Sequence, residues 1–244
     1  MIKCAYTNIL ESSSVTLAVG TEDPACPLYR LSDRNIGRMF QPLAASTVTV
    51  KIDQGSSPAA VDRLIIPAGH NLDGIALALT FSDNDVSYTS MVPGWTAQAG
   101  VIEKSWAAAT HRYWKFTITN PSVVPALGEL FLSATYEWER NPARPQPSLE
   151  PVFNVRCETT SSGQDRFLVS GEAKRRRLYT VGRCSQVQAD NMLALYGAWA
   201  GSRPFWICDH EGQWIFGRLD ESLALTETGN QAYGFKFSFI EVLP

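Results

Sequence analysis

Apolar residues alternate with polar ones in short segments throughout the first half of this 244-residue chain. Such alternation places the apolar side chains of a strand on one face of a sheet. Clusters of Gly, Asn, Asp and Pro separate the segments, and no long helical stretch lies between them. This pattern predicts an antiparallel sandwich or jelly roll. The alternating segments are 46–52, 74–81, 114–118 and 130–134, a short apolar run lies at 63–67, and the turn clusters are 53–58, 67–71 and 82–85.

The second half also begins with strand patterns. Apolar and polar residues alternate over 152–158 and 165–169, and further strands are predicted at 204–208, 213–219 and 232–242. In the last of these segments four aromatic residues alternate and should face one buried side of a sheet. They are Tyr233, Phe235, Phe237 and Phe239.

One segment of the second half has helical spacing. Ser185 is a predicted N-cap for a helix over 186–199, which carries an apolar stripe. The stripe consists of Val187, Met192, Leu195, Tyr196 and Trp199. One helix packed on an antiparallel sheet is the simplest assembly, so we expect a mainly β protein with a C-terminal β-sandwich and one packed α-helix.

A proline-rich segment separates the two halves. Residues 139–151 contain four prolines among polar residues. Because repeated proline removes backbone donors and favours extended geometry, this segment should be a semi-rigid connector. We therefore predict a jelly-roll domain over 1–140, a linker over 141–151 and a β-sandwich domain with its helix over 152–244.

Composition and charge exclude several classes of protein. The hydrophobic fraction of 45% is that of a globular protein, and a net charge of −3 gives no electrostatic footprint for nucleic acid. No run of about 18 apolar residues predicts a membrane span, and no secretory signal opens the sequence. We expect a protein made soluble in a cytoplasm, with no nucleic-acid partner. Its five scattered cysteines are expected to be free, mostly buried thiols.

The sequence contains no motif for a cofactor, a metal or a catalytic nucleophile. Cys208 and His210 could share a strand face, but two ligands do not make a zinc site. A two-carboxylate glycosidase site stays open, because its acids come from separated strands. The candidate acids are Asp33, Asp53, Asp83 and Asp85, and their alternative role is to cap turns with their carboxylates. We expect no metal, no cofactor and no enzymatic activity.

Two other features have competing interpretations. Trp95 and Trp106 lie in a turn-rich segment, 93–109, where an aromatic ring could stack on a sugar; alternatively both cover the core or are buried by a neighbouring subunit. The basic run 174–177 could contact nucleic acid, but in a β-rich domain it is better explained as a solvated strand edge or a salt-bridge element between subunits.

Six short motifs occur in the first half in a characteristic order. They are Leu31–Phe40, Thr49–Asp53, Asp62–Ile66, Phe81–Asp85, Arg112–Ile118 and Gly128–Leu132. In this order they resemble discoidin-type, galactose-binding-like jelly rolls over about residues 28–138. The resemblance implies that a ligand lies among loops at one end of the barrel. With the exposed aromatic added, the candidate ligand-binding residues are Asp33, Arg34, Asn35, Asp83, Asn84, Asp85 and Trp95.

The C-terminal quarter carries a second resemblance. A helix pattern precedes Trp-Ala-Gly-Ser-Arg-Pro-Phe-Trp-Ile-Cys-Asp at 199–209, and the alternating aromatic strand follows. This layout resembles the C-terminal β-sandwich of tailed-bacteriophage tail-tip proteins of the distal-tail and minor-tail class.

The second resemblance implies a homo-oligomeric ring in the virion tail, other tail proteins as partners, and a host-surface glycan as a candidate ligand of the jelly roll. The expected function is a structural component of a phage or prophage tail tip or baseplate. The alternatives are a free-standing carbohydrate-binding protein and a glycan hydrolase.

Overall fold

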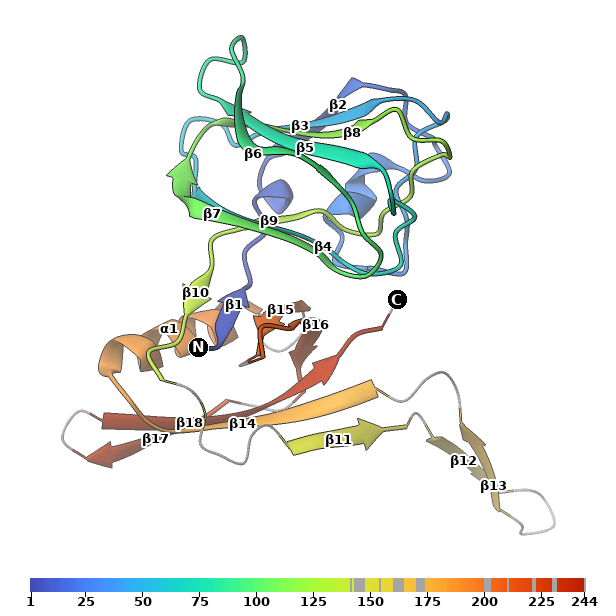
Figure 1. Ribbon diagram of the computed structural model, residues 1–244. Coiled ribbons are helices and arrows are strands. Elements are labelled where there is room, and N and C mark those ends of the chain that lie inside the picture. Colours follow the sequence, from blue (N-terminus) through green and yellow to red (C-terminus); the bar gives the residue numbers. More distant parts are fainter. Residues whose placement is uncertain are drawn as a thin grey trace. The chain divides into compact units, whose positions relative to one another are not determined.

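The chain forms two compact units, each rich in β-strands (Figure 1). One unit comprises Cys4–Tyr136, and the other comprises Met1–Lys3 with Glu137–Leu243. We call them the N-terminal unit and the C-terminal unit. The computed structural model describes all residues except 141, 143–147, 154, 160–164, 170–173, 200–202, 210, 221–222, 230–231 and 244. The described residues are mainly β with one α-helix, which confirms the predicted fold class.

The N-terminal unit is a sandwich of two antiparallel sheets. The five-stranded sheet has the order β2-β3-β8-β5-β6, and the three-stranded sheet has the order β7-β4-β9. The strands are β2 (Ser14–Val19), β3 (Val48–Asp53), β4 (Ala60–Ile66), β5 (Ala76–Ser82), β6 (Thr89–Thr96), β7 (Ile102–Thr110), β8 (Tyr113–Thr119) and β9 (Phe131–Ser133). Two short 3₁₀ helices, η1 (Ile9–Glu11) and η2 (Leu28–Leu31), complete the unit.

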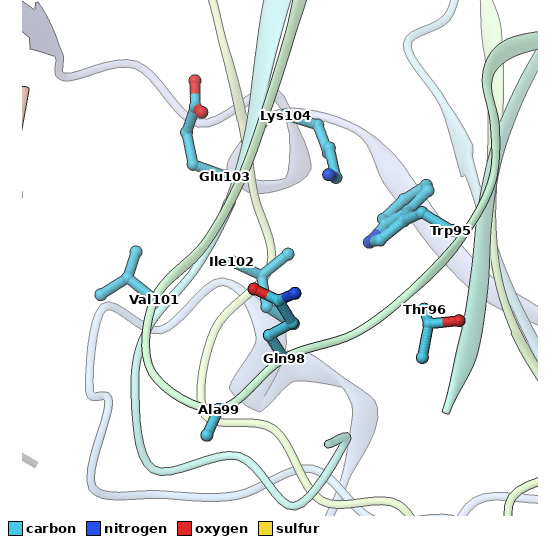
Figure 2. A pocket seen from close by; sticks show the side chains of 8 residues that line it. All are labelled: Trp95, Thr96, Gln98, Ala99, Val101, Ile102, Glu103 and Lys104. Atoms are coloured by element: carbon cyan, nitrogen blue, oxygen red, sulfur yellow. The ribbon is translucent and has the colours of Figure 1, made fainter. Parts of the chain in front are cut away.

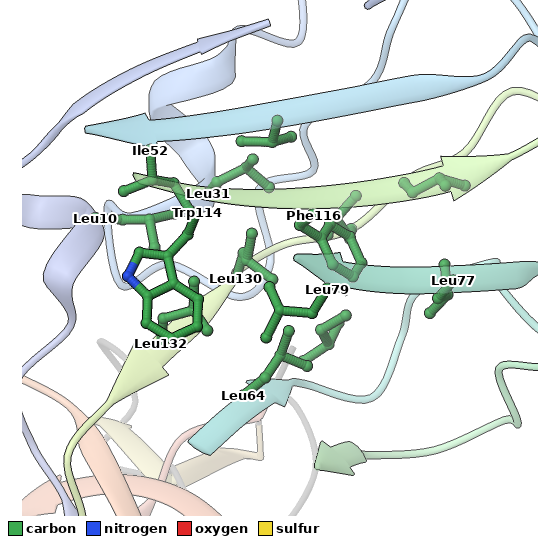
Figure 3. Close-up of a cluster of buried hydrophobic side chains, with 14 of the residues drawn as sticks. Leu10, Leu31, Ile52, Leu64, Leu77, Leu79, Trp114, Phe116, Leu130 and Leu132 are labelled. Carbon is green, nitrogen blue, oxygen red and sulfur yellow. The ribbon is translucent and has the colours of Figure 1, made fainter. Parts of the chain in front are cut away.

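The core of the sandwich follows from the alternation seen in the sequence. Every second residue of β8 is fully buried, namely Trp114, Phe116 and Ile118. Figure 3 shows Trp114 and Phe116 pointing from the five-stranded sheet toward Leu64 and Leu132 of the other sheet. The apolar faces of the two sheets therefore bury each other, as a sandwich requires.

The segment 93–109, predicted as turn-rich, is instead mostly strand. It contains the end of β6 and most of β7, each at the edge of its sheet. Pro93 is tolerated because an edge strand has one row of backbone groups without ladder partners. The outward face of β7 carries Ser105 and Ala107, so the apolar contrast that marks a strand is weak there.

The C-terminal unit contains one long sheet, a separate hairpin and the helix. The sheet has the order β10-β1-β15-β16-β18-β14-β11, with β17 also paired to β18, and the hairpin is β12-β13. The strands are β1 (Lys3–Ala5), β10 (Tyr136–Glu137), β11 (Ser148–Val152), β12 (Val155–Thr159), β13 (Asp165–Val169), β14 (Lys174–Cys184), β15 (Phe205–Cys208), β16 (Trp214–Leu219), β17 (Ala224–Gly229) and β18 (Ala232–Glu241). The helix is α1 (Gln186–Trp199).

Aromatic rings fill the interior of this unit. Trp138, which follows β10, is fully buried, and its ring centroid lies 5.4 Å from that of Phe235 and 5.6 Å from that of Phe237. Because β10 and β18 lie at well-separated places in the strand order, these contacts show that the sheet curls back over itself. Phe239 is also fully buried and Tyr233 is half-buried, so the predicted buried face of the last strand is confirmed for its three phenylalanines.

The helix begins as predicted, but its buried stripe differs from the expected one. Ser185 Oγ accepts a hydrogen bond from Gln188 N at 3.2 Å, as an N-cap should. Met192 and Leu195 are buried, whereas Val187 is 65% exposed. Spacing alone predicts Val187 as part of the stripe. In the structure the buried residues of that turn are Gln188 and Ala189. The side chain of Trp199 lies outside the described residues.

The first residues of the chain belong to the C-terminal unit, which the predicted domain limits did not anticipate. Ile2 is 2% exposed, and its carbonyl accepts a hydrogen bond from Trp138 N at 3.0 Å. Lys3 Nζ lies 3.7 Å from a carboxylate oxygen of Glu137. The predicted linker, 141–151, also needs correction at its end, because 148–151 pair with β14 as part of β11. Most of its remainder lies outside the described residues.

The basic run 174–177 is not a solvated strand edge. It begins β14, which lies between β18 and β11. Arg177 is buried and donates a hydrogen bond to Asp209 at 2.8 Å, and Arg176 pairs with Asp220 at 2.6 Å. Both arginines are therefore neutralised within their own unit, which an isolated strand pattern could not reveal.

The cysteines are free thiols, as expected, and Cys4, Cys184 and Cys208 are buried. His210, considered above with Cys208 as a possible zinc ligand, lies outside the described residues. No helix in the described part of the chain is long and apolar enough to cross a membrane.

Candidate ligand-binding site

A pocket opens where the edge strands β6 and β7 approach each other. Trp95 of β6 lies opposite the buried Leu77 of β5, so its ring points to the inner side of the sandwich. Lys104 lies two residues from the buried Ile102 along β7, so it shares the face of Ile102 and also points inward. Figure 2 shows the side chains of Trp95 and Lys104 on the same side of the pocket, with Glu103 pointing away from them.

The pocket has a volume of about 190 Å³. It is lined by Trp95, Thr96, Gln98, Ala99, Val101, Ile102, Glu103 and Lys104. The ammonium of Lys104 lies 5.6 Å from the centre of the Trp95 ring, which is a cation–π contact. The site thus combines an aromatic wall with hydrogen-bonding and charged side chains.

The two charged residues of the pocket differ in their partners. Glu103 forms an ion pair with Arg63. No carboxylate among the described residues forms an ion pair with Lys104. The indole N–H of Trp95 is buried and has no hydrogen-bond partner among the described residues. The Lys104 ammonium and the Trp95 indole N–H are therefore two donor groups that a ligand can engage.

Both tryptophans of this region pack against the core of the sandwich. Trp106 donates its indole hydrogen bond to the carbonyl of Val61 at 2.9 Å, and its ring centroid lies 6.0 Å from that of Trp114. This confirms the core-covering interpretation for Trp106. Trp95 is only half-buried, so it both covers the core and forms the wall of the pocket.

The loop that closes the pocket, 97–101, is held by His70. Nδ1 of His70 accepts a hydrogen bond from Leu72 N at 3.1 Å, which leaves the proton on Nε2 to be donated to the carbonyl of Gly100 at 2.8 Å. Ala97 adds a backbone bond to Ile75 at 2.8 Å. Burial lowers the pKa of His70, so the neutral ring that makes both bonds is favoured.

The predicted loop at Asp33 does not present all its side chains to solvent. The carboxylate of Asp33 caps its own turn by accepting a hydrogen bond from Asn35 N at 2.9 Å, and burial raises its pKa. The guanidinium of Arg34 pairs with Glu11 and donates to the carbonyl of Tyr6 at 2.8 Å. With its side chain only 4% exposed, Arg34 is a structural residue of the interior and is not placed to contact a ligand.

Glu129 is the buried acid behind this loop, and it was not among the predicted site residues. Its two carboxylate oxygens accept hydrogen bonds from Asn8 Nδ2 at 3.1 Å and from the backbone N–H of Arg34 at 3.0 Å. Burial raises the pKa of Glu129 well above its usual value, against the lowering effect of the Arg34 charge. The residue fixes a loop whose Arg34 has a left-handed φ of 57°.

The predicted residues 83–85 lie at a different place, in the loop between β5 and β6. Asp83 lies 3.1 Å from His111 Nδ1, and Asn84 Oδ1 accepts a hydrogen bond from Val86 N at 2.9 Å. Asp85 forms an ion pair with Lys51 and accepts a bond from the Tyr88 hydroxyl at 2.5 Å. The side chains of Asp83, Asn84 and Asp85 therefore stabilise the loop, and both aspartates have partners within the N-terminal unit.

Two of the candidate glycosidase acids, Asp53 and Asp85, lie in ion pairs that favour their ionised forms. Asp53 accepts a hydrogen bond from Arg112 Nε at 2.8 Å, and this bond lowers its pKa. The hydrogen bond from Lys51 likewise lowers the pKa of Asp85. A glycosidase acid needs the opposite shift, so neither side chain fits that role. The predicted residues thus occupy three places, and no described contact joins Trp95 to either loop.

Comparison with known proteins gives partial likenesses only. No family model matches the sequence, and no curated protein matches it. Solved structures that resemble part of the chain include chitosan-binding module 1 of a chitosanase/glucanase from Paenibacillus sp. IK-5, with 14% identity over 52% of this chain and 99% of that one and a TM-score of 0.46.

Two further structures show likenesses of the same kind. A GH29 fucosidase of Ruminococcus gnavus in complex with fucose has 19% identity over 54% of this chain and 27% of that one, with a TM-score of 0.46. The module CpGH89CBM32-5 of Clostridium perfringens, in complex with GalNAc-β-1,3-galactose, has 10% identity over 52% of this chain and 100% of that one, with a TM-score of 0.43. The tail-tip resemblance of the C-terminal half is not tested by these likenesses and stays a prediction.

Proposed function

We propose that the N-terminal unit is a non-catalytic carbohydrate-binding domain whose site is the pocket at Trp95. One observation carries the proposal: the pocket joins an aromatic wall to the Lys104 ammonium, which has no carboxylate partner among the described residues, and to the Trp95 indole N–H, which has no hydrogen-bond partner among them. Sugar rings present apolar C–H faces that pack on aromatic rings, and their hydroxyls need hydrogen-bonding groups at the rim.

The size and lining of the pocket suit a small ligand group. A volume of about 190 Å³ is below the range of about 300–1,000 Å³ for drug-sized ligands, so one sugar ring at a chain end fits better than an oligosaccharide. Gln98 and Thr96 are exposed at the rim, where they can exchange water for sugar hydroxyls. Weak, millimolar binding worth about 4 kcal/mol is the expected strength.

The test is a glycan-array survey followed by calorimetric titration of the full chain with the best sugar. Trp95→Ala should weaken binding at least about ten-fold, which corresponds to 1.4 kcal/mol. Asp85→Asn serves as the control, because it alters the other loop end of the same unit. Loss of binding in Asp85→Asn with retention in Trp95→Ala would move the site to the loop at 83–85.

The absence of catalysis is part of this proposal. It is supported by the ion pairs of Asp53 and Asp85, which lower the pKa of both carboxyls and so disfavour the protonated general acid that a glycosidase needs. The wild-type chain should therefore release no sugar from glycan or peptidoglycan substrates. Release that disappears in a folded Asp53→Asn protein would favour the glycan hydrolase instead.

For the C-terminal unit the proposal is assembly, as a ring at the tail tip of a phage particle. It is supported by the order of elements, because α1 precedes a strand that opens with Phe205 and Trp206 after Pro204. The helix also leaves Val187 and Leu193 65% and 42% exposed, which gives apolar surface for a neighbouring copy.

Light scattering at high protein concentration and a search of purified tail particles test this part. A closed homo-oligomer, or presence in tails, is the expected outcome. A monomer that is absent from particles but still binds glycan would identify a free-standing carbohydrate-binding protein.

A further inference from the structure

We propose that the pocket at Trp95 selects acidic sugars, meaning sugar residues that carry a carboxylate. This inference rests on the proposed carbohydrate binding and adds the class of ligand. It is carried by Lys104, the only lysine of the pocket, whose ammonium faces the Trp95 ring and has no carboxylate partner among the described residues.

The charge that faces the pocket is positive. Glu103 is the only acid in the lining, and it alternates with Lys104 along β7, so it points to the opposite side of the strand. Figure 2 shows this divergence directly. The ion pair with Arg63 further compensates the charge of Glu103. A ligand in the pocket therefore meets one uncompensated cation and no uncompensated anion.

The neighbouring groups are also donors. The amide of Gln98 lies at the mouth of the pocket, and the indole N–H of Trp95 has no acceptor in the part of the chain that the structure describes. A carboxylate is an acceptor-only group with two oxygens, and its hydrogen bonds to a cation are shorter and stronger than neutral ones. A neutral sugar would leave the ammonium desolvated without a counter-charge, whereas an acidic sugar supplies one.

An inward-pointing lysine on an edge strand has a second explanation. Such charges prevent the edge from pairing with another sheet. This explanation requires a charge at Lys104 but places no requirement on the ligand. The two explanations therefore differ in whether the choice between acidic and neutral sugars depends on the lysine.

The experiment compares sugars that differ only at C6, galacturonate with galactose and glucuronate with glucose. They are titrated into the full chain at low and at high salt. The acidic member of each pair should bind about ten-fold more tightly at low salt, and added salt should reduce the difference. Lys104→Gln should weaken binding of the acidic sugar more than that of the neutral sugar and so remove the preference, and Lys104→Arg should retain the preference.

Lys115→Gln is the matched control, because this lysine lies 3.6 Å from the ring centre of Tyr88, outside the residues that line the pocket. It should leave the preference unchanged. Equal affinity for acidic and neutral sugars would overturn the inference and leave the proposed function standing. A preference that survives in Lys104→Gln, or that disappears equally in Lys115→Gln, would also overturn it. A wild-type chain that binds neither class of sugar would overturn the proposed function itself.

Discussion

The two units bury the apolar faces of their sheets in different ways. The N-terminal unit packs two sheets face to face, and most of its core residues are aliphatic side chains around Trp114 and Phe116. The C-terminal unit curls one sheet and fills it with rings, among them Trp138, Tyr179 and Phe237. In a sandwich the edge strands of the two sheets come close to each other, and the Trp95 pocket lies where β6 approaches β7. The curled sheet closes itself with the first residues of the chain.

This difference teaches where each unit is vulnerable. The strands of the sandwich come from one continuous segment, so its stability depends on contacts within 4–136. The C-terminal unit needs Ile2 as well as residues beyond Glu137, so it cannot be completed by a fragment that begins at 152. If the two cores are independent, a substitution in one unit should leave the stability of the other unit unchanged.

The largest effect is expected from removing one central ring of each core. Trp138→Ala and Trp114→Ala should each lower the free energy of unfolding of their own unit by about 3–5 kcal/mol, because each ring is fully buried. Denaturant unfolding with probes in both units measures this. If one substitution shifts both transitions equally, the cores are coupled and the comparison fails.

A smaller effect is expected where a glycine allows two backbone segments to approach. A Cβ on Gly217 would lie 2.3 Å from the carbonyl oxygen of Ile240, and one on Gly128 would lie 2.4 Å from that of Ile36. Each Gly→Ala change should cost its own unit about 1–3 kcal/mol through overpacking. Gly182→Ala is the control, because a Cβ there meets nothing within 4 Å. Equal stability of the Gly217 and Gly182 variants would refute the close approach.

The smallest effect is a pH dependence confined to the N-terminal unit. Burial lowers the pKa of His70, while the nearby Asp73 opposes this. The unfolded chain therefore binds more protons between the folded pKa and the ordinary value of about 6.5, so stability falls as the pH drops through that window. His70→Gln should flatten this part of the curve when thermal unfolding is followed from pH 7.5 to pH 5.5. Identical slopes in both proteins would contradict it.

The sequence predicts elements where burial on one side alternates with solvent on the other. This holds for β3, β8 and β18, and for α1, whose start is marked by the Ser185 cap. It failed for β6, β7 and β17, where the local sequence lacks a clear apolar alternation, and it missed β2, although Val15, Leu17 and Val19 alternate there. Local patterns do not record which side of an edge strand the fold covers.

The site shows the same limit. Trp95 is predicted as a ligand-binding residue because it is aromatic, but nothing in the sequence pairs it with Lys104. The two residues meet only because β6 and β7, the edge strands of two different sheets, lie side by side in the sandwich. Arg34 is predicted as a ligand-binding residue because the jelly-roll resemblance implies a ligand among the loops. Its interior position depends on Glu129, 95 residues later in the chain, which no local pattern connects to it.

The strand that carries Lys3 has a consequence for the time course of synthesis. It lies beside β15 in the sheet order, yet β15 is roughly 200 residues further along the chain. At a translation rate of about 5–20 residues per second, the first strand waits about 10–40 s for this partner, while the whole N-terminal unit can fold. During that interval the residues that bury Ile2 in the folded unit are not yet all synthesised. Thus β1 is synthesised early, but the sheet to which it belongs can form only after β15 has been synthesised.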